Sequence, residues 1–274
     1  MCRMEDGTTE RSEMRAIEER LRPHLDENAA SLWLEKWLQI HAGAHPAVFF
    51  GLYRVLRPRQ DRSRAATPDK LVVIEGFPRS GNSFARRAFI MAQDETFDVT
   101  RIAHHLHVPA QVIRAAQWRI PTLVLIRNPK DAVVSLVIRD PISVDQALRY
   151  YVSFYETVEK YRDAYVLGRF EEVTEDFGQV IRRINEKFGT NFSAFDHNEQ
   201  HVDEVFARVE RNSKKRFGKT SWENKVSRPF ASRERLKREV GYELQSPRRR
   251  ALISRAETVY DRLISSTPKP APKG

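Results

Sequence analysis

The chain has 274 residues, and 47 basic against 37 acidic side chains give it a formal net charge of +10 at pH 7. Such a surface attracts polyanions, including nucleotides, nucleic acid and sulfated glycans. Cys2 is the only cysteine, which excludes a disulfide framework and a cysteine-ligated zinc site. The charged N-terminus and the absence of any apolar stretch of about 18 residues favour a soluble, cytoplasmic protein.

The two ends of the chain are polar, and we expect residues 1–14 and 266–274 to be disordered tails around a single domain over residues 15–265. Residues 14–57 carry apolar side chains at helical spacing, which predicts one or two amphipathic helices separated near Pro46. The aromatic residues between positions 32 and 57 adjoin a basic linker. Peripheral membrane contact is therefore an alternative to burial in the core.

Short apolar runs rich in β-branched residues predict buried strands at 71–76 and 122–127, and a third is predicted at 165–170. A helical pattern follows each strand. The first helix is predicted at 84–93, the second at 129–138 with a further aromatic-rich helix at 143–162, and the last at 177–188. Gly189 closes this last helix. The alternation of strands and helices predicts a parallel sheet. We expect an α/β three-layer sandwich, with a central parallel sheet flanked by helices.

The segment from 198 to 238 is dense in Arg and Lys and shows no clear period. It is expected to be irregular and to close over a ligand, with a last helix at about 246–264. The aromatic stripe on the 143–162 helix includes both buried and exposed faces. It is expected to serve packing, because apolar spacing of this kind more often serves packing than recognition, and the alternative is that it lines the acceptor pocket.

A first candidate phosphate element lies between the first predicted strand and the helix that follows it. Residues 76–83, with the sequence GFPRSGNS, have the frame of the Walker A loop, G-x-x-x-x-G-K-S/T, except that Asn82 takes the lysine position. Backbone N–H groups and the helix N-terminus would converge there on an anion. Arg79 is expected to supply the missing positive charge. The alternative is a glycine turn that merely joins strand to helix.

A second candidate phosphate element, RNPKDAVVS at residues 127–135, begins at the C-terminal end of the second predicted strand. Ligands bind at this end of the strands in open parallel sheets. Arg127 and Ser135 can both reach one phosphate. Two such elements at strand ends, in this order, indicate a nucleotide-binding site more specifically than either element alone.

With these two motifs the chain resembles the sulfotransferases that use 3′-phosphoadenosine 5′-phosphosulfate (PAPS) as donor. Their 5′ loop typically has the sequence Y/F-P-K/R-S-G-T-T-W/L and their 3′-phosphate element the sequence R-N-P-K-D-x-x-x-S, to which residues 77–84 and 127–135 correspond. The resemblance covers residues 70–240. It implies a P-loop-like nucleotide site and the transfer of a sulfuryl group from PAPS to an acceptor hydroxyl, with release of adenosine 3′,5′-bisphosphate (PAP). The chemistry requires no metal.

The resemblance also implies roles for individual residues. Arg79 takes the place of the family's catalytic basic residue, and Arg127 and Ser135 hold the 3′-phosphate. The 5′-phosphosulfate would be held by Ser80, Gly81, Asn82 and Ser83. The chain departs from the family in having Asn82 and Ser83 where threonines are usual, Phe84 where many members have an adenine-stacking tryptophan, and Phe170 where a tyrosine is common.

The family's C-terminal loop, R-K-G-x-x-G-D-W, has only a shorter counterpart in this chain, at residues 216–222. The resemblance makes Arg216 and Gly218 candidates for contacts with the 3′-phosphate. Arg228 is an alternative.

Three of the eight histidines lie close together at positions 104, 105 and 107. Histidine titrates near neutrality, which suits a general base. Several family members carry a K-T-H-L-P sequence whose histidine acts as base, and the corresponding position, 22 residues before Arg127, is His105. Glu75 ranks second as base and is expected rather to support the loop. A core role or a metal site is the alternative for the histidines, although no nearby carboxylate or cysteine completes a metal site.

The sequence leaves the acceptor open among glycans, lipids and small alcohols. A P-loop-type kinase or NTPase with a degenerate Walker A loop is the main alternative, but the lysine is missing and Arg127 stands where such an enzyme needs a Mg²⁺-holding acid. A nucleic-acid-binding module is a second alternative, for which no recognition motif is found. The expected partners are therefore the nucleotide donor and a hydroxyl-bearing acceptor, and the oligomeric state stays open.

Overall fold

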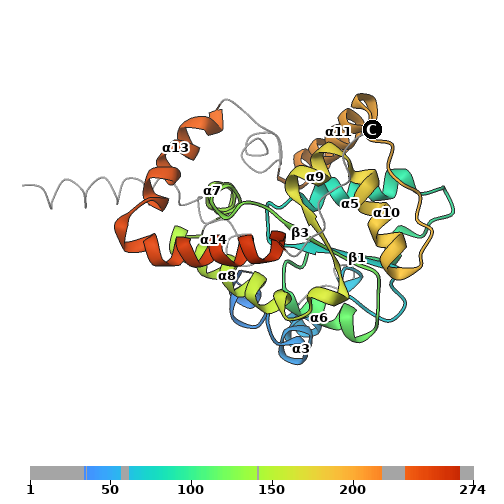
Figure 1. The fold of residues 1–274 in the computed structure, drawn as a ribbon, viewed down its shortest axis with the longest axis horizontal. Coiled ribbons are helices and arrows are strands. Elements are labelled where there is room, and N and C mark those ends of the chain that lie inside the picture. Colours follow the sequence, from blue (N-terminus) through green and yellow to red (C-terminus); the bar gives the residue numbers. More distant parts are fainter. Residues whose placement is uncertain (1–33, 35, 57–61, 141, 218–231, 266–274) are drawn as a thin grey trace, which may run out of the picture.

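The computed structural model describes residues 34, 36–56, 62–140, 142–217 and 232–265 (Figure 1). Its centre is a sheet of four strands: β1 (Val72–Gly76), β2 (Ile102–His104), β3 (Thr122–Ile126) and β4 (Val166–Arg169). The strand order is β2-β1-β3-β4, and each neighbouring pair is parallel. The predicted parallel sheet is confirmed.

The strand order has a direct consequence for ligand binding. From β1 the chain passes to β2 on one side, and it then returns across β1 to β3 on the other side. In open α/β sheets, ligands bind at the carboxyl ends of the strands where the order reverses in this way. That point lies between β1 and β3, whose C-terminal ends adjoin in the register Gly76 to Leu125.

Both faces of the sheet are covered, because β3 sends alternate side chains to two different cores. Leu123 and Leu125 pack with helices α5 (Asn82–Ala92), α9 (Phe170–Glu175), α10 (Phe177–Phe188) and α11 (Glu199–Phe217). Val124 and Ile126 pack with α6 (Pro109–Gln117), α7 (Pro129–Arg139), α8 (Val144–Glu159), α13 (Ser232–Leu244) and α14 (Arg250–Ser265). The expected layered α/β architecture is therefore confirmed.

The remaining described elements are α3 (Pro46–Leu56) and three short 3-10 turns, η1 (Val99–Arg101), η2 (Arg162–Ala164) and η3 (Pro247–Arg249). Residues 36–41 are helical, and Pro46 begins α3, so the predicted separation at this proline is confirmed. Residues 1–33, including both the N-terminal tail and the start of the first predicted helix, lie outside the described residues, as does the C-terminal tail. None of the described helices is both long and apolar enough to cross a membrane.

The structure corrects the expected irregular segment at 198–238, since residues 199–217 form helix α11. Its apolar positions are sparse, and the two buried ones, Val205 and Val209, stand one helical turn apart among charged side chains that obscure the period. The prediction also missed β2, which has only three residues, and α6, which starts at Pro109 directly after the histidine cluster. Residues 218–231 lie outside the described part of the chain.

Candidate active site

The first phosphate element forms a tight turn between β1 and α5. A Cβ at Gly76 would lie 2.5 Å from the carbonyl oxygen of Leu125, so only glycine fits beside β3. Gly81, at the N-cap of α5, has a φ of 93°, and no side chain caps this helix. The leading N–H groups of α5 therefore suit an anion. The Asn82 amide nitrogen donates to the Phe77 carbonyl at 3.0 Å, which closes the turn from inside.

The second phosphate element contacts the first directly. The Arg79 side chain is buried, and its Nε donates to the Ser135 hydroxyl on α7 at 2.8 Å. Arg127, which follows β3, donates from Nη1 to the Arg79 carbonyl at 3.4 Å. Arg79 itself has a φ of 73°, a left-handed conformation that is uncommon outside glycine. Two arginines thus meet at the point where the strand order reverses.

Arg127 is oriented by an aromatic ring. Its guanidinium carbon lies 4.1 Å from the centroid of the Phe170 ring, a cation–π arrangement. The same ring approaches Gly81, where an added Cβ would lie 3.4 Å from it. Burial lowers the pKa of Arg127, and its Nε has no hydrogen-bond partner among the described residues. Phe170 therefore lies between the two phosphate elements, and its ring packs against the guanidinium group of Arg127.

Buried tyrosines of α8 contact both phosphate elements. The Tyr155 hydroxyl donates to the Leu125 carbonyl at 2.8 Å and lies 3.3 Å from the Ser80 hydroxyl. The Tyr151 hydroxyl donates to the Arg127 carbonyl at 2.8 Å. The predicted packing role of the aromatic stripe is confirmed for these buried rings, but their hydrogen bonds at the site were missed. The signal was the choice of tyrosine over phenylalanine, since a buried hydroxyl needs a partner.

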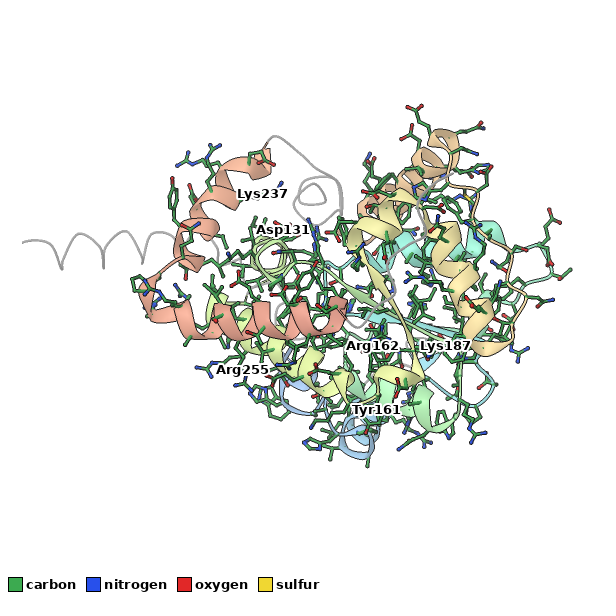
Figure 2. All side chains as sticks on the ribbon, in the orientation of Figure 1. Asp131, Tyr161, Arg162, Lys187, Lys237 and Arg255 are labelled. Atoms are coloured by element: carbon green, nitrogen blue, oxygen red, sulfur yellow. The ribbon has the colours of Figure 1, made fainter. Side chains whose placement is uncertain are left out.

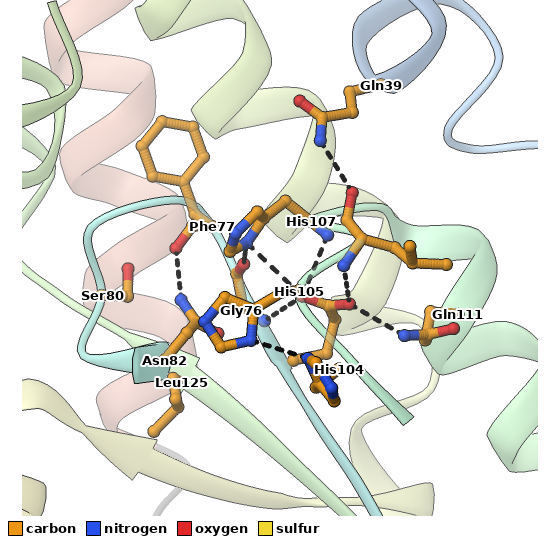
Figure 3. A network of polar contacts seen from close by, with 12 residues as sticks. Gln39, Gly76, Phe77, Ser80, Asn82, His104, His105, His107, Gln111 and Leu125 are labelled. Carbon is orange, nitrogen blue, oxygen red and sulfur yellow. Dashed lines mark hydrogen bonds and ion pairs between the residues drawn. The ribbon is translucent and has the colours of Figure 1, made fainter. Parts of the chain in front are cut away.

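Glu75 bonds to the turn that carries the histidines, residues 104–107, which we call the histidine turn. Its fully buried carboxyl group accepts hydrogen bonds from the N–H groups of Leu106 and His107, both at 3.0 Å, from Gly76 at 3.1 Å and from the Gln111 side chain at 3.1 Å (Figure 3). Burial raises the pKa of Glu75 to about 8, against the opposing effect of these bonds. With both oxygens engaged, Glu75 is placed to support the turn rather than to receive a proton from an acceptor.

His105 lies beside the phosphate loop. Its Nε2 is 3.2 Å from the Ser83 hydroxyl at the start of α5. Its Nδ1 is 3.0 Å from Nδ1 of His104 (Figure 3). Both His105 and His107 have a φ of 56°. Burial, followed by the neighbouring imidazoles and the arginines at 64 and 86, holds the pKa of His105 well below its usual range. The ring is therefore neutral at pH 7.

The contact between the two histidines restricts the tautomer of His105. Only one of the two Nδ1 atoms can carry the hydrogen in this bond. When Nδ1 of His105 donates to His104, Nε2 of His105 keeps a lone pair on the side of Ser83 and the loop. In that tautomer the arrangement can accept a proton next to a bound anion.

The other predicted site residues are placed as follows. The Phe84 ring is buried and packs against the rings of Phe177, Phe195, His197 and Phe206, and its predicted adenine contact stays a prediction. Arg216 belongs to α11, where its side chain is not among the described ones. Gly218 and Arg228 lie outside the described residues.

The alternative of a metal site finds no support in the part of the chain that the structure describes, where no group of three or more His, Cys, Asp or Glu side chains could hold a metal ion. His107 is otherwise engaged, because its Nδ1 lies 2.7 Å from the Gly76 carbonyl oxygen. This contact ties the histidine turn to the end of β1.

No protein-family model matches the sequence, and no curated protein matches it. Among solved structures, the chain is similar to mouse sulfotransferase SULT7A1 complexed with PAP, with a TM-score of 0.39 and 13% sequence identity. The match covers 77% of this chain and 89% of that one.

The histidine turn predicts a marked acid sensitivity of the fold. Burial lowers the pKa of His104 to about 2 and that of His107 to about 3, whereas the unfolded chain binds these protons near 6.5. Unfolding therefore takes up protons below pH 6.5, and the stability contributed by neutral histidines is lost as the pH falls toward 3. Glu75 acts oppositely, since its contribution is lost as the pH rises from 4.5 to about 8. Below pH 6, the protons that the three histidines take up on unfolding outnumber the proton that Glu75 releases.

We expect the free energy of unfolding, measured in urea, to fall by about 2 kcal/mol per pH unit between pH 6 and pH 5. In His107→Asn, unfolding should take up about one proton fewer, so the dependence of the unfolding free energy on pH should be less steep. The turn should be retained, because asparagine tolerates the left-handed backbone and can still donate to the Gly76 carbonyl. The exposed His45→Gln variant is the control and should keep the original slope. An unchanged slope in His107→Asn would contradict the neutral, buried state of His107.

Proposed function

We propose that this chain is a sulfotransferase that transfers a sulfuryl group from PAPS to a hydroxyl group of an acceptor. The observation that carries the proposal is the contact of the two phosphate elements through Arg79, Ser135 and Arg127. A donor with phosphate groups at both its 5′ and 3′ positions needs two anion sites at the same edge of the sheet. The resemblance of both sequence motifs to those of PAPS-dependent enzymes supports this choice of donor.

Arg127 favours a 3′-phosphate over the alternative of a metal-bound nucleotide. It follows β3, where a P-loop kinase would need an acid to hold Mg²⁺, and it is held in a fixed plane by Phe170. A fixed guanidinium suits the planar recognition of a phosphate. In the first element, Asn82 bonds to the turn itself and brings no charge to the phosphate. Both features weigh against a kinase or NTPase.

The proposed reaction is an in-line displacement. His105 accepts the proton of the acceptor hydroxyl at Nε2 while the acceptor oxygen forms its bond to sulfur and the bond from sulfur to the bridging oxygen of PAPS breaks. Arg79 and the N–H groups of the loop stabilise the charge that develops on the departing phosphate. PAP and the sulfate ester are released, and the proton on His105 passes to solvent.

Donor binding changes the charge around His105. Binding of PAPS brings negative charge next to Ser83 and hence close to Nε2 of His105. An opposite charge at this distance stabilises the imidazolium and raises the pKa of the ring. We assign His104 a positioning role: when its Nδ1 accepts the hydrogen bond from Nδ1 of His105, the lone pair of the His105 ring is at Nε2.

Binding of PAP tests the donor assignment without knowledge of the acceptor. In Arg127→Ala we expect the affinity for PAP, measured by titration calorimetry, to fall about 10- to 100-fold, because a charged hydrogen-bond partner of the 3′-phosphate is removed. The affinity for AMP, which lacks that phosphate, should change little. Lys130→Ala is the control from the same motif: this side chain is half-exposed and pairs with Glu257 at 2.8 Å.

Two results would contradict the donor assignment. One is an equal loss of PAP and AMP affinity in Arg127→Ala, which would remove the 3′-phosphate from this arginine. The other is tighter binding of ATP with Mg²⁺ than of PAP by the unmodified protein, which would favour the kinase alternative.

A further inference from the structure

Helix α3 presents apolar side chains on both of its sides. Phe49, Phe50 and Tyr53 are buried in the core. The opposite side is exposed to solvent and carries Val48, Leu52, Val55 and Leu56, whose exposed fractions are 53%, 37%, 80% and 45%. A helix that is apolar all round normally lies inside a protein or against a partner. Figure 1 shows α3 at the outer edge of the molecule, with α6 beside it.

The exposed apolar surface extends from α3 to the end of α6. Trp118, directly after α6, is 40% exposed. Arg114 joins the two helices, because its guanidinium carbon lies 3.5 Å from the centroid of the Phe50 ring and 5.4 Å from that of Trp118. We call the exposed side of α3 together with Arg114, Trp118 and Arg119 the α3 face.

The charges on the α3 face are all positive. Neither residues 36–56 nor residues 104–121 contain an aspartate or glutamate. Arg54 on α3 lies close enough to Arg114 to lower its pKa, second only to the effect of burial. Arg54, Arg114 and Arg119 form no ion pair with a carboxylate of the described residues. The repulsion between Arg54 and Arg114 is therefore not relieved by a carboxylate of the described residues.

Several basic side chains elsewhere on the surface are paired. Arg255, labelled in Figure 2, bonds to Glu156 at 2.7 Å, and Arg262 bonds to Glu159 at 2.7 Å. Lys237 on α13 pairs with Glu234 at 2.6 Å. The α3 face differs from these helical surfaces in that neither of its two segments, residues 36–56 and 104–121, contains an acidic side chain.

From this combination we propose that the α3 face binds the surface of an anionic lipid bilayer. Exposed aliphatic side chains, a tryptophan and unpaired arginines on one short helical surface are the features of helices that lie in the membrane interface. A second copy of the chain would bring the same cations against one another, and nucleic acid offers no apolar partner for Val55 and Leu52. The inference goes beyond the proposed transferase activity and does not depend on it.

Sedimentation with lipid vesicles tests the proposal on the full chain. We expect binding to vesicles of phosphatidylcholine and phosphatidylglycerol, weak binding to phosphatidylcholine alone, and a loss of binding as salt is added. The variant Leu52→Glu/Val55→Glu should bind the anionic vesicles at least about tenfold more weakly, because it places two acids on the apolar side. Both side chains are exposed, so the fold, checked by circular dichroism, should be unchanged.

Tyr242→Glu is the matched control. Tyr242 is a large apolar side chain that is 75% exposed on α13, and Figure 1 shows α13 well separated from α3. This variant should bind vesicles like the unmodified protein. The proposal is overturned if anionic vesicles are not bound, if both variants bind equally, or if Leu52→Glu/Val55→Glu instead dissolves a dimer detected by sedimentation velocity without lipid.

Discussion

Replacement of His105 by asparagine is expected to lower the turnover of PAPS by about 10²- to 10⁴-fold, the range typical for loss of a general base. Asparagine suits the left-handed backbone at this position, where φ is 56°, so the turn should be retained. The affinity for PAP should remain close to that of the unmodified protein, because the hydrogen bond of His105 to the loop is made to the Ser83 hydroxyl, which asparagine leaves in place. Turnover can be followed as label transferred from PAPS to acceptors in fractionated extracts of glycans, lipids and small alcohols.

The His104→Asn variant separates positioning from catalysis. Its loss of turnover should be smaller, and its pH–rate profile should shift, because the hydrogen-bond partner that selects the His105 tautomer has changed. Near-normal turnover in His105→Asn would remove this residue from the base role. Absence of any labelled product with the unmodified protein would count against the transferase activity itself.

Replacement of Glu75 by alanine is expected to reduce the free energy of unfolding by about 3–5 kcal/mol. It leaves the buried N–H groups of Gly76, Leu106 and His107 without their acceptor, and each such loss costs about 1–3 kcal/mol when the sites cannot relax. Urea unfolding at pH 7 measures the difference. Glu75→Gln keeps one acceptor oxygen and should lose less.

Glu156→Ala provides the surface control for this experiment. Glu156 also makes two hydrogen bonds, both to Arg255, but the pair is exposed and screened by solvent, so its loss should change the free energy of unfolding only slightly. If Glu75→Ala lost no more than Glu156→Ala, the carboxylate would not hold the histidine turn in the way its contacts indicate.

Local signals in the sequence were sufficient for the elements that surround the candidate donor site. The strand before Gly76, the helix that starts at Asn82 and the helix that ends at Gly189 follow from β-branched runs, glycine positions and apolar periodicity. The proximity of Arg79 and Ser135, 56 residues apart, follows from the expectation that both motifs lie at strand ends of one parallel sheet.

Contacts that depend on strand pairing could not be predicted in the same way. The bonds from Glu75 to residues 106 and 107 exist because β2 pairs with β1, and a strand of three residues leaves too short a pattern to detect. The contact of Phe170 with Arg127 depends likewise on β4 lying next to β3. Helix α11 was missed for another reason, since its many charges exceed its few buried apolar positions.

The pairing of β1 with β2 has a consequence for how the proposed catalytic groups come together. His104 lies opposite Ile74 in the parallel register, so the separation between the imidazole of His105 and the phosphate loop is set by the spacing of two adjacent strands. Parallel strands buried in a packed sheet do not slide past each other during turnover. The proposed base and the proposed donor loop are therefore preassembled, so no binding energy of either substrate is needed to align them.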